Sequence, residues 1–158
     1  MVTNVYLDNT LGGLKNFLGT YAADEIDHSI FAGKVFPHHA IVNTKTSSDG
    51  EMGHWILISR YYEYDKIILE IYDSFGYPIS ALSKNIKMLI TKLEYDFLVT
   101  NNIIVQHVLS QYCGFFCIAR ILSIMNGESL IKHLNIFSTN LIENNDTVCD
   151  YIKSINKR

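Results

Sequence analysis

The residues from 105 to 117 carry the strongest chemical signal in this sequence: Val-Gln-His-Val-Leu-Ser-Gln-Tyr-Cys-Gly-Phe-Phe-Cys. Cys113 opens an apolar, helix-like run, and Gln106 stands seven positions before it. Upstream, His54 follows a glycine at the start of a strand-like stretch, and Asp73 ends the next such stretch. In chain order these four residues supply the base, orienting carboxylate, oxyanion donor and nucleophile that a thiol protease requires.

Cys113 is a candidate nucleophile because it stands at the start of a predicted helix. Free cysteine is often only a small buried hydrophobic residue, but the unpaired N–H groups and positive dipole end of a helix favour a thiolate. Gly114 leaves room for a substrate backbone, and its N–H is placed to stabilise an oxyanion. Cys117 lies one turn further along the apolar face and is interpreted as core, and Cys149 has no partner pattern.

His54 is the best candidate for the base among six histidines. It alone starts a strand after a glycine loop and precedes an aromatic residue, Trp55. Neighbouring strands lie ~4.8 Å apart, so Asp73 and His54 can meet at one sheet edge. Glu70 is the rival carboxylate, and because side chains alternate along a strand we expect it to face away from the side of Asp73.

Gln106 is a neutral donor within an otherwise apolar stretch that reads as a strand. A buried amide requires hydrogen-bond partners or a function. Donation to a tetrahedral oxyanion is such a function. Gln111, which stands in the turn before the predicted helix, is the rival donor.

The elements that must position these residues are predicted from hydrophobic periodicity and from turn residues. We expect helices over residues 8–18 (capped by Asp8 or Asn9), 78–94 (starting at Pro78), 113–125, 128–137 and 140–155, and strands over 39–44, 54–62, 66–73 and 102–109. This order predicts an α+β fold in which a small, mostly antiparallel or mixed central β-sheet is flanked by helices. We expect one domain spanning residues 1–158.

Composition narrows the class of protein. Of 158 residues, 48% are hydrophobic and 18% charged, which is typical of a globular chain. The net charge of −3 gives no indication of nucleic acid or an anionic membrane as partner. No apolar run approaches the ~18 residues of a membrane span, and no N-terminal signal pattern is seen. Three cysteines are an odd number, so we infer a reducing compartment.

Taken together, these residues resemble the adenovirus endopeptidase (adenain) family, over roughly residues 16–125. The order of His-Trp, Asp, Gln and Cys-Gly is shared with the wider clan of SUMO and ubiquitin-like-protein proteases. The flanking blocks single out the adenain branch. The matching blocks are Phe17–Tyr21, Ala40–Thr44, His54-Trp55, Tyr72–Tyr77, Val105-Gln106, Ser110 and Cys113–Cys117.

The resemblance implies a papain-like-clan cysteine protease that needs no cofactor or metal for its chemistry. It implies Cys113 as nucleophile, His54 as base, Asp73 as orienter and Gln106 as oxyanion donor, with Trp55 as one wall of a narrow substrate tunnel. It further implies cleavage of viral precursor proteins of the capsid or core, at Gly-Gly or Gly-x-Gly sites, during virion maturation. The protein would then act in the virion and in the reducing cytoplasm or nucleus of the infected host cell.

The sequence departs from the family in ways that change these expectations. Asp73 stands where adenovirus enzymes usually carry Glu, and the chain is expected to lack their longer C-terminal region. No cysteine lies between Asp73 and Gln106, so a family-type activating peptide would bind without a disulfide. The net charge of −3 argues against stimulation by DNA. We expect a monomer without a membrane partner, from a virophage or related virus.

Two other classes of function stay open on the sequence. One is a SUMO-type or deubiquitinase-like protease of host conjugates, which uses the same catalytic order; an acetyltransferase with a His-acid-Cys site is a variant. The other is a non-enzymatic capsid-associated or zinc-binding protein. Its support is Cys113 and Cys117 with nearby histidines, a spacing without the second cysteine pair of structural zinc sites.

Overall fold

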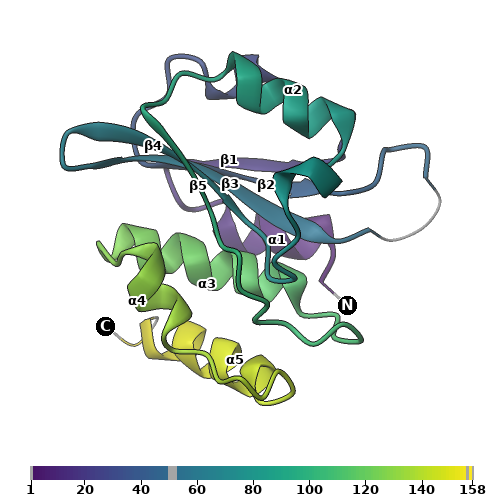
Figure 1. The fold of residues 1–158 in the computed structure, drawn as a ribbon, viewed down its shortest axis with the longest axis vertical. Coiled ribbons are helices and arrows are strands. Elements are labelled where there is room, and N and C mark those ends of the chain that lie inside the picture. The colour runs from purple at the N-terminus through teal and green to yellow at the C-terminus, as the bar shows by residue number, and fades with distance from the viewer. Residues whose placement is uncertain (1, 50–52, 156, 158) are drawn as a thin grey trace.

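The fold was analysed in a computed structural model, which describes residues 2–49, 53–155 and 157. It contains a five-stranded mixed sheet in the order β1-β2-β3-β4-β5, with antiparallel central pairs and a parallel pair at each edge (Figure 1). The strands are β1 (Phe17–Tyr21), β2 (His38–Asn43), β3 (Trp55–Glu63), β4 (Lys66–Tyr72) and β5 (Phe97–Thr100). The predicted α+β architecture is confirmed. The domain predicted over 1–158 includes residues 1, 50–52, 156 and 158, which lie outside the described residues.

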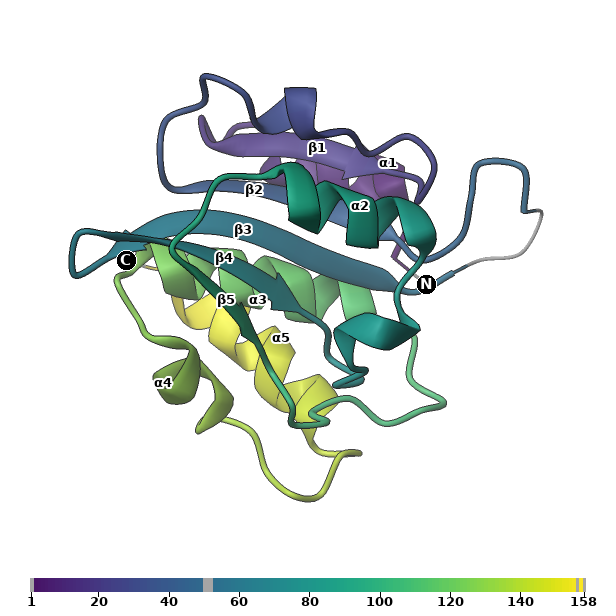
Figure 2. The ribbon, with the colours of Figure 1, turned by 45° about the horizontal axis from the view of Figure 1, so that its top comes forward.

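Helices cover both faces of the sheet (Figures 1 and 2). The helices are α1 (Asn4–Leu11), α2 (Lys84–Lys92), α3 (Cys113–Met125), α4 (Leu130–Leu134) and α5 (Asn144–Ile155), with 3-10 turns η1 (His28–Phe31) and η2 (Ile79–Ala81). Alternation along β3 sends Leu57 into a core with α1, α3 and α5, and Ile56 and Ile58 into a second core under α2. In the described part of the chain, no helix is long and apolar enough to cross a membrane.

The helix predicted over residues 8–18 is wrong in position. The observed α1 starts at Asn4 after Thr3, whose hydroxyl accepts a hydrogen bond from the Tyr6 N–H at 3.2 Å. Gly12 and Gly13 follow its last residue, and glycine is a poor helix former. The residues from Phe17 onward pair with β2 instead. Asp8 caps nothing and accepts the Thr20 hydroxyl at 2.9 Å.

Two further predictions are corrected on either side of β5. The helix predicted from Pro78 is split, because α2 starts only after Ser83, whose hydroxyl caps it by accepting the Ile86 N–H at 3.3 Å. The strand predicted over 102–109 is a loop, and β5 precedes it. The backbone N–H groups of Val105 and Gln106 both donate to the Ser74 carbonyl at 3.0 Å instead of joining a ladder.

The elements that flank the candidate site are as predicted. Helix α3 begins at Cys113 and ends at Met125, before Gly127 with its φ of 74°. Strands β3 and β4 form the predicted antiparallel hairpin, with His54 immediately before β3 and Asp73 immediately after β4. The last two helical patterns are present as α4 and α5, both shorter than predicted.

Candidate active site

His54, Asp73 and Cys113 come together where β3 begins, β4 ends and α3 begins. His54 Nε2 lies 2.5 Å from Asp73 Oδ1, and both side chains are largely buried. The Cys113 thiol lines the same hollow as His54, and each of the two groups shifts the pKa of the other. His54 Nδ1 makes no hydrogen bond of good geometry to any described residue. This nitrogen is therefore available to exchange a proton with the thiol.

The surroundings favour a thiolate–imidazolium pair. Burial lowers the pKa of His54, but the hydrogen bond to Asp73 and the interaction with Cys113 outweigh it and raise the pKa to about 9. Burial raises the pKa of Cys113, but His54 and the backbone N–H groups of Trp55 and Gly114 bring it below its ordinary value. No side chain caps α3, and the Gly114 N–H in its first turn helps to lower the pKa of the thiol.

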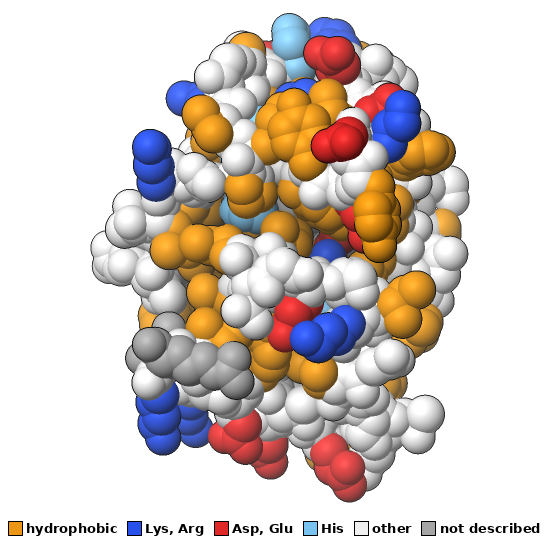
Figure 3. All heavy atoms as spheres, turned by 90° about the vertical axis from the view of Figure 1, so that its left-hand side faces the viewer, with side chains coloured by type: hydrophobic (Ala, Val, Ile, Leu, Met, Phe, Trp, Pro, Cys, Tyr) orange, Lys and Arg blue, Asp and Glu red, His pale blue; other side chains and the backbone are white. Residues whose placement is uncertain are grey.

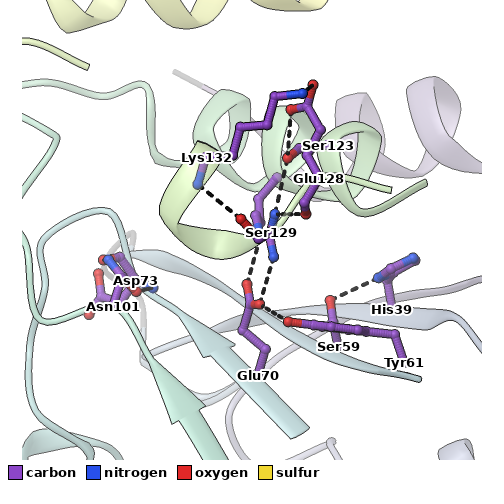
Figure 4. A network of polar contacts seen from close by, with 11 residues as sticks. His39, Ser59, Tyr61, Glu70, Asp73, Asn101, Ser123, Glu128, Ser129 and Lys132 are labelled. Carbon is purple, nitrogen blue, oxygen red and sulfur yellow. Dashed lines mark hydrogen bonds and ion pairs between the residues drawn. The ribbon is translucent and has the colours of Figure 1, made fainter. Parts of the chain in front are cut away.

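Asp73 is held by a residue that the sequence did not single out, Asn101. The Asp73 N–H donates to Asn101 Oδ1 at 2.8 Å, and Asn101 Nδ2 donates to the Asp73 carbonyl at 2.5 Å (Figure 4). The carboxylate also accepts the Phe75 N–H at 2.8 Å, and the Phe75 ring stacks on His54 with centroids 4.2 Å apart. A sequence prediction that placed β5 correctly would have pointed to Asn101. Thr100 pairs with Ile71 in the parallel β4–β5 pair, so the residue after β5 lies beside the residues that follow β4.

Glu70, the rival carboxylate, takes part in a different pair. Its oxygens accept from Arg120 Nε at 2.7 Å and Nη2 at 2.8 Å, and from the Tyr61 hydroxyl at 2.6 Å (Figure 4). Glu70 and Arg120 are both fully buried. This pair ties β4 to α3, and Glu70 does not contact His54.

Gln106 lies in the loop that leads into Cys113, not in a strand. Its side chain is fully buried, with Oε1 accepting from the Ser74 hydroxyl at 2.5 Å and Nε2 donating to the Ser110 carbonyl at 2.9 Å. One amide hydrogen remains for another acceptor. Gln111 is exposed and lines the hollow around Cys113, whereas Gln106 is not among the described residues lining it. The role of Gln106 stays a prediction.

Trp55 and Gly114, the candidate substrate-binding residues, both contact Val2. The Trp55 indole donates to the Val2 carbonyl at 3.0 Å, and its side chain lines the hollow around Cys113. Gly114 is buried, and a Cβ there would lie 2.5 Å from Val2 Cγ1, so a larger residue does not fit without movement. Sequence reasoning missed Val2 because its partner at position 55 is far away in the chain.

The other two cysteines are not activated as Cys113 is. Cys117 is buried, its thiol donates to the Trp55 carbonyl at 3.6 Å, and burial raises its pKa well above the ordinary value. Burial likewise raises the pKa of Cys149. Among the described residues, no group of three His, Cys, Asp or Glu side chains is arranged to hold a metal ion.

No protein-family model and no curated protein sequence matches this chain. Among solved structures it is similar to the ASFV pS273R protease, with a TM-score of 0.66 and 16% identity, covering 94% of this chain and 66% of that one. A weaker likeness is to AvrA delL154 with IP6 and CoA, with a TM-score of 0.45 and 16% identity, covering 94% of this chain and 53% of that one. Another is to the Legionella pneumophila effector protein RavZ, with a TM-score of 0.39 and 12% identity, covering 87% of this chain and 51% of that one.

The chain thus spans just under two thirds of the ASFV pS273R protease and about half of AvrA and RavZ. At this identity the likeness to that protease bears on the fold alone. The chain therefore shares the α+β fold of the ASFV pS273R protease.

Proposed function

We propose that this protein is a cysteine endopeptidase. The observation that carries the proposal is the buried His54, bound through Nε2 to Asp73 and facing the Cys113 thiol at the start of α3. A base held by a carboxylate beside a thiol of lowered pKa is the arrangement that nucleophilic catalysis requires. The fold shared with the ASFV pS273R protease supports the same assignment.

In the proposed reaction, the Cys113 thiolate attacks the carbonyl carbon of the scissile peptide bond. The N–H of Gly114 and the amide of Gln106 stabilise the negative charge that develops on the carbonyl oxygen. The His54 imidazolium gives its Nδ1 proton to the leaving amine, which yields a thioester. His54 then takes a proton from a water molecule, which hydrolyses the thioester and restores the thiolate. Asp73 holds the ring and stabilises its charged form.

For the substrate, we propose viral precursor polypeptides of the capsid or core, cut at Gly-Gly or Gly-x-Gly sites during virion maturation. The support is the resemblance of the catalytic blocks to the adenain family and the small hollow around Cys113, of about 210 Å³. The setting would be the virion and the reducing interior of the infected cell. Any activating peptide would bind without a disulfide, and the enzyme would act as a monomer.

The test compares three substrates at equal concentration: a peptide with a central Gly-Gly, a ubiquitin conjugate and a SUMO conjugate. We expect the wild-type protein to cut the peptide on the carboxyl side of a glycine, and Cys113→Ala to cut nothing. Preference for either conjugate would replace the precursor substrate with a host one. Absence of turnover on all three, with no activation of the Cys113 thiol, would contradict the proposed protease activity.

A further inference from the structure

The loop between β5 and α3 carries Gln106 and ends at Cys113, and it is not part of the sheet. Outside a strand ladder, a loop keeps one shape only where other hydrogen bonds satisfy its backbone and fix its side chains. On one side these bonds come from the Ser74 carbonyl, which accepts the N–H groups of Val105 and Gln106, each at 3.0 Å. On the other side they come from helix α5, which lies outside the blocks that resemble the adenain family.

The first residue of α5, Asn144, holds the loop at Val105. Its side chain is fully buried, and its Nδ2 donates to the Val105 carbonyl at 2.8 Å and to the Ser138 carbonyl at 2.9 Å. Its Oδ1 accepts the Ser138 N–H at 2.8 Å. Both amide hydrogens and the amide oxygen of Asn144 are thus used, so the start of α5 is fixed relative to the start of this stretch of the loop.

The next residue, Asn145, holds the same loop further along, at Ser110. The Ser110 hydroxyl donates to Asn145 Oδ1 at 2.8 Å and accepts the Tyr112 N–H at 3.3 Å. The carbonyl of Ser110 accepts Gln106 Nε2 at 2.9 Å. Ser110 therefore links α5 both to the Gln106 amide and to the residue before Cys113.

The direction of the Gln106 amide depends on two serines. Its Oε1 accepts from the Ser74 hydroxyl at 2.5 Å, and its Nε2 donates to the Ser110 carbonyl. These two bonds fix the plane of the amide, so its second N–H can point in one direction only. Because a shift of about 1 Å in a group that acts on the transition state can cost ~100-fold in rate, the position of Ser110 matters for an oxyanion donor.

We propose that Asn145 is a positioning residue that acts on Gln106 through Ser110. By accepting the Ser110 hydroxyl, it keeps the Ser110 carbonyl where the Gln106 amide needs it, and Asn144 anchors α5 to the same loop. The inference rests on the proposed protease activity for the role of Gln106 as oxyanion donor. The hold of α5 on the loop depends only on the hydrogen bonds described.

The first test measures kcat and KM on a Gly-Gly peptide. We expect Asn145→Ala to lower kcat by ~10-fold with KM unchanged. Asn145→Asp keeps the acceptor oxygen for Ser110 and should stay within ~2-fold of wild type. Asn140→Ala is the matched control, because this exposed asparagine precedes α5 and bonds only within its own turn, to Glu143 and Ile142. An equal loss in Asn145→Asp or in Asn140→Ala would overturn the proposal.

The second test asks whether Asn145 acts through Gln106. If it does, adding Asn145→Ala to Gln106→Ala should lower kcat by no more than a further ~2-fold, because the group to be positioned is already gone. The same substitution in the wild-type background should have its full effect. A full additional loss in the double variant would show that Asn145 acts elsewhere and would overturn the assignment.

The third test needs no turnover. Backbone hydrogen–deuterium exchange is followed by mass spectrometry over residues 105–112, with circular dichroism as the check on folding. We expect Asn145→Ala to speed exchange there several-fold, and Asn145→Asp and Asn140→Ala to keep the wild-type rate. If exchange changes in this way but wild type cuts no peptide, the protease activity is wrong and the hold of α5 on the loop is supported. Unchanged exchange in Asn145→Ala overturns the proposal about Asn145.

Discussion

Two buried carboxylates three residues apart in sequence, Glu70 and Asp73, have opposite environments. Glu70 shares both oxygens between Arg120 and Tyr61, and Arg120 in turn donates to the Ser123 hydroxyl at 3.0 Å (Figure 4). The Glu70 network is thus closed. Asp73 uses Oδ1 for His54, while its Oδ2 has no hydrogen-bond partner among the described residues.

The comparison separates a structural ion pair from a candidate catalytic one. Buried polar groups are nearly always hydrogen-bonded, so unsatisfied ones call for a reason. The unpaired His54 Nδ1 lies beside a thiol whose pKa is lowered, where a proton must move during the reaction. We infer that the Arg120–Glu70 pair holds α3 against β4. The His54–Asp73 pair, which the ends of these elements position, would take part in the reaction.

The largest expected effect comes from removing either member of the reactive pair. Cys113→Ala should abolish turnover, and His54→Ala should lower kcat/KM by ~10⁴–10⁶-fold, because the nucleophile and the base act as a unit. Both variants should remain folded by circular dichroism. Cys149→Ser, at a partly exposed site with a raised pKa, is the control and should keep its activity. Loss of turnover in the control with activity in Cys113→Ser would reassign the nucleophile.

The next prediction compares substitutions of the two carboxylates, Glu70 and Asp73. Glu70→Gln leaves the fully buried charge of Arg120 poorly compensated, so the free energy of unfolding should fall by ~3–5 kcal/mol. Its kcat at a temperature where it is folded should be near wild type. Asp73→Asn should instead keep most of its stability and lose kcat by up to ~10⁴-fold, since the carboxylate orients and stabilises the charged ring.

Denaturant titration and initial rates on the same preparations separate these outcomes. The main-chain hydrogen bonds between residues 73 and 101 survive in Asp73→Asn, which is why its fold should persist. If Asp73→Asn were fully active while folded Glu70→Gln were inactive, the orienting role would belong to Glu70.

A smaller effect is expected at the oxyanion donor. Gln106→Ala should lower kcat by ~10²–10³-fold with little change in KM, because the amide acts mainly in the transition state. Gln111→Ala is the matched control, since this exposed glutamine lines the hollow but is not held by Ser74. A loss confined to Gln111→Ala would reverse the two roles.

The smallest expected effect is that of DNA. The net charge is −3, and Figure 3 shows acidic and basic side chains interspersed on one face of the molecule, with no basic patch in the part of that face free of grey atoms. Duplex DNA should therefore change the initial rate on a Gly-Gly peptide by less than ~2-fold at physiological salt, where phosphate contacts are weakened. Many-fold stimulation would point to a local basic surface, such as the exposed Lys84, Lys87 and Lys92 side chains of α2.

The elements that position the candidate site, α3 and the β3–β4 hairpin, could be predicted because their sequence patterns are local. An apolar run bounded by Cys113 and Asn126 gave α3, and two β-rich stretches joined by a short turn gave the hairpin that brings His54 to Asp73. The helix predicted over 8–18 is wrong because Gly12 and Gly13 follow the last residue of α1. The strand predicted over 102–109 is wrong because this segment is a loop, in which Ile103 and Ile104 are more than half exposed.

What could not be predicted depends on contacts between distant segments. Asn101 reaches Asp73 only because β5 pairs in parallel with β4. Val2 reaches Trp55 across 53 positions of sequence, and nothing in its local pattern distinguishes it from any other valine. Residue types and spacing therefore pointed to the candidate site, while the residues that hold and shape it required the tertiary structure.

The most direct test is the rate at which iodoacetamide alkylates Cys113 as the pH is varied from 5 to 10, in wild type and in His54→Ala. Because the pKa of Cys113 is lowered and that of His54 is raised to about 9, the wild-type thiol should react as a thiolate at pH values where an ordinary cysteine is still protonated. In His54→Ala this reactivity should appear only at higher pH, and Cys117 should stay unlabelled in both. A Cys113 that reacts with the same pH profile in both proteins would contradict the thiolate–imidazolium pair.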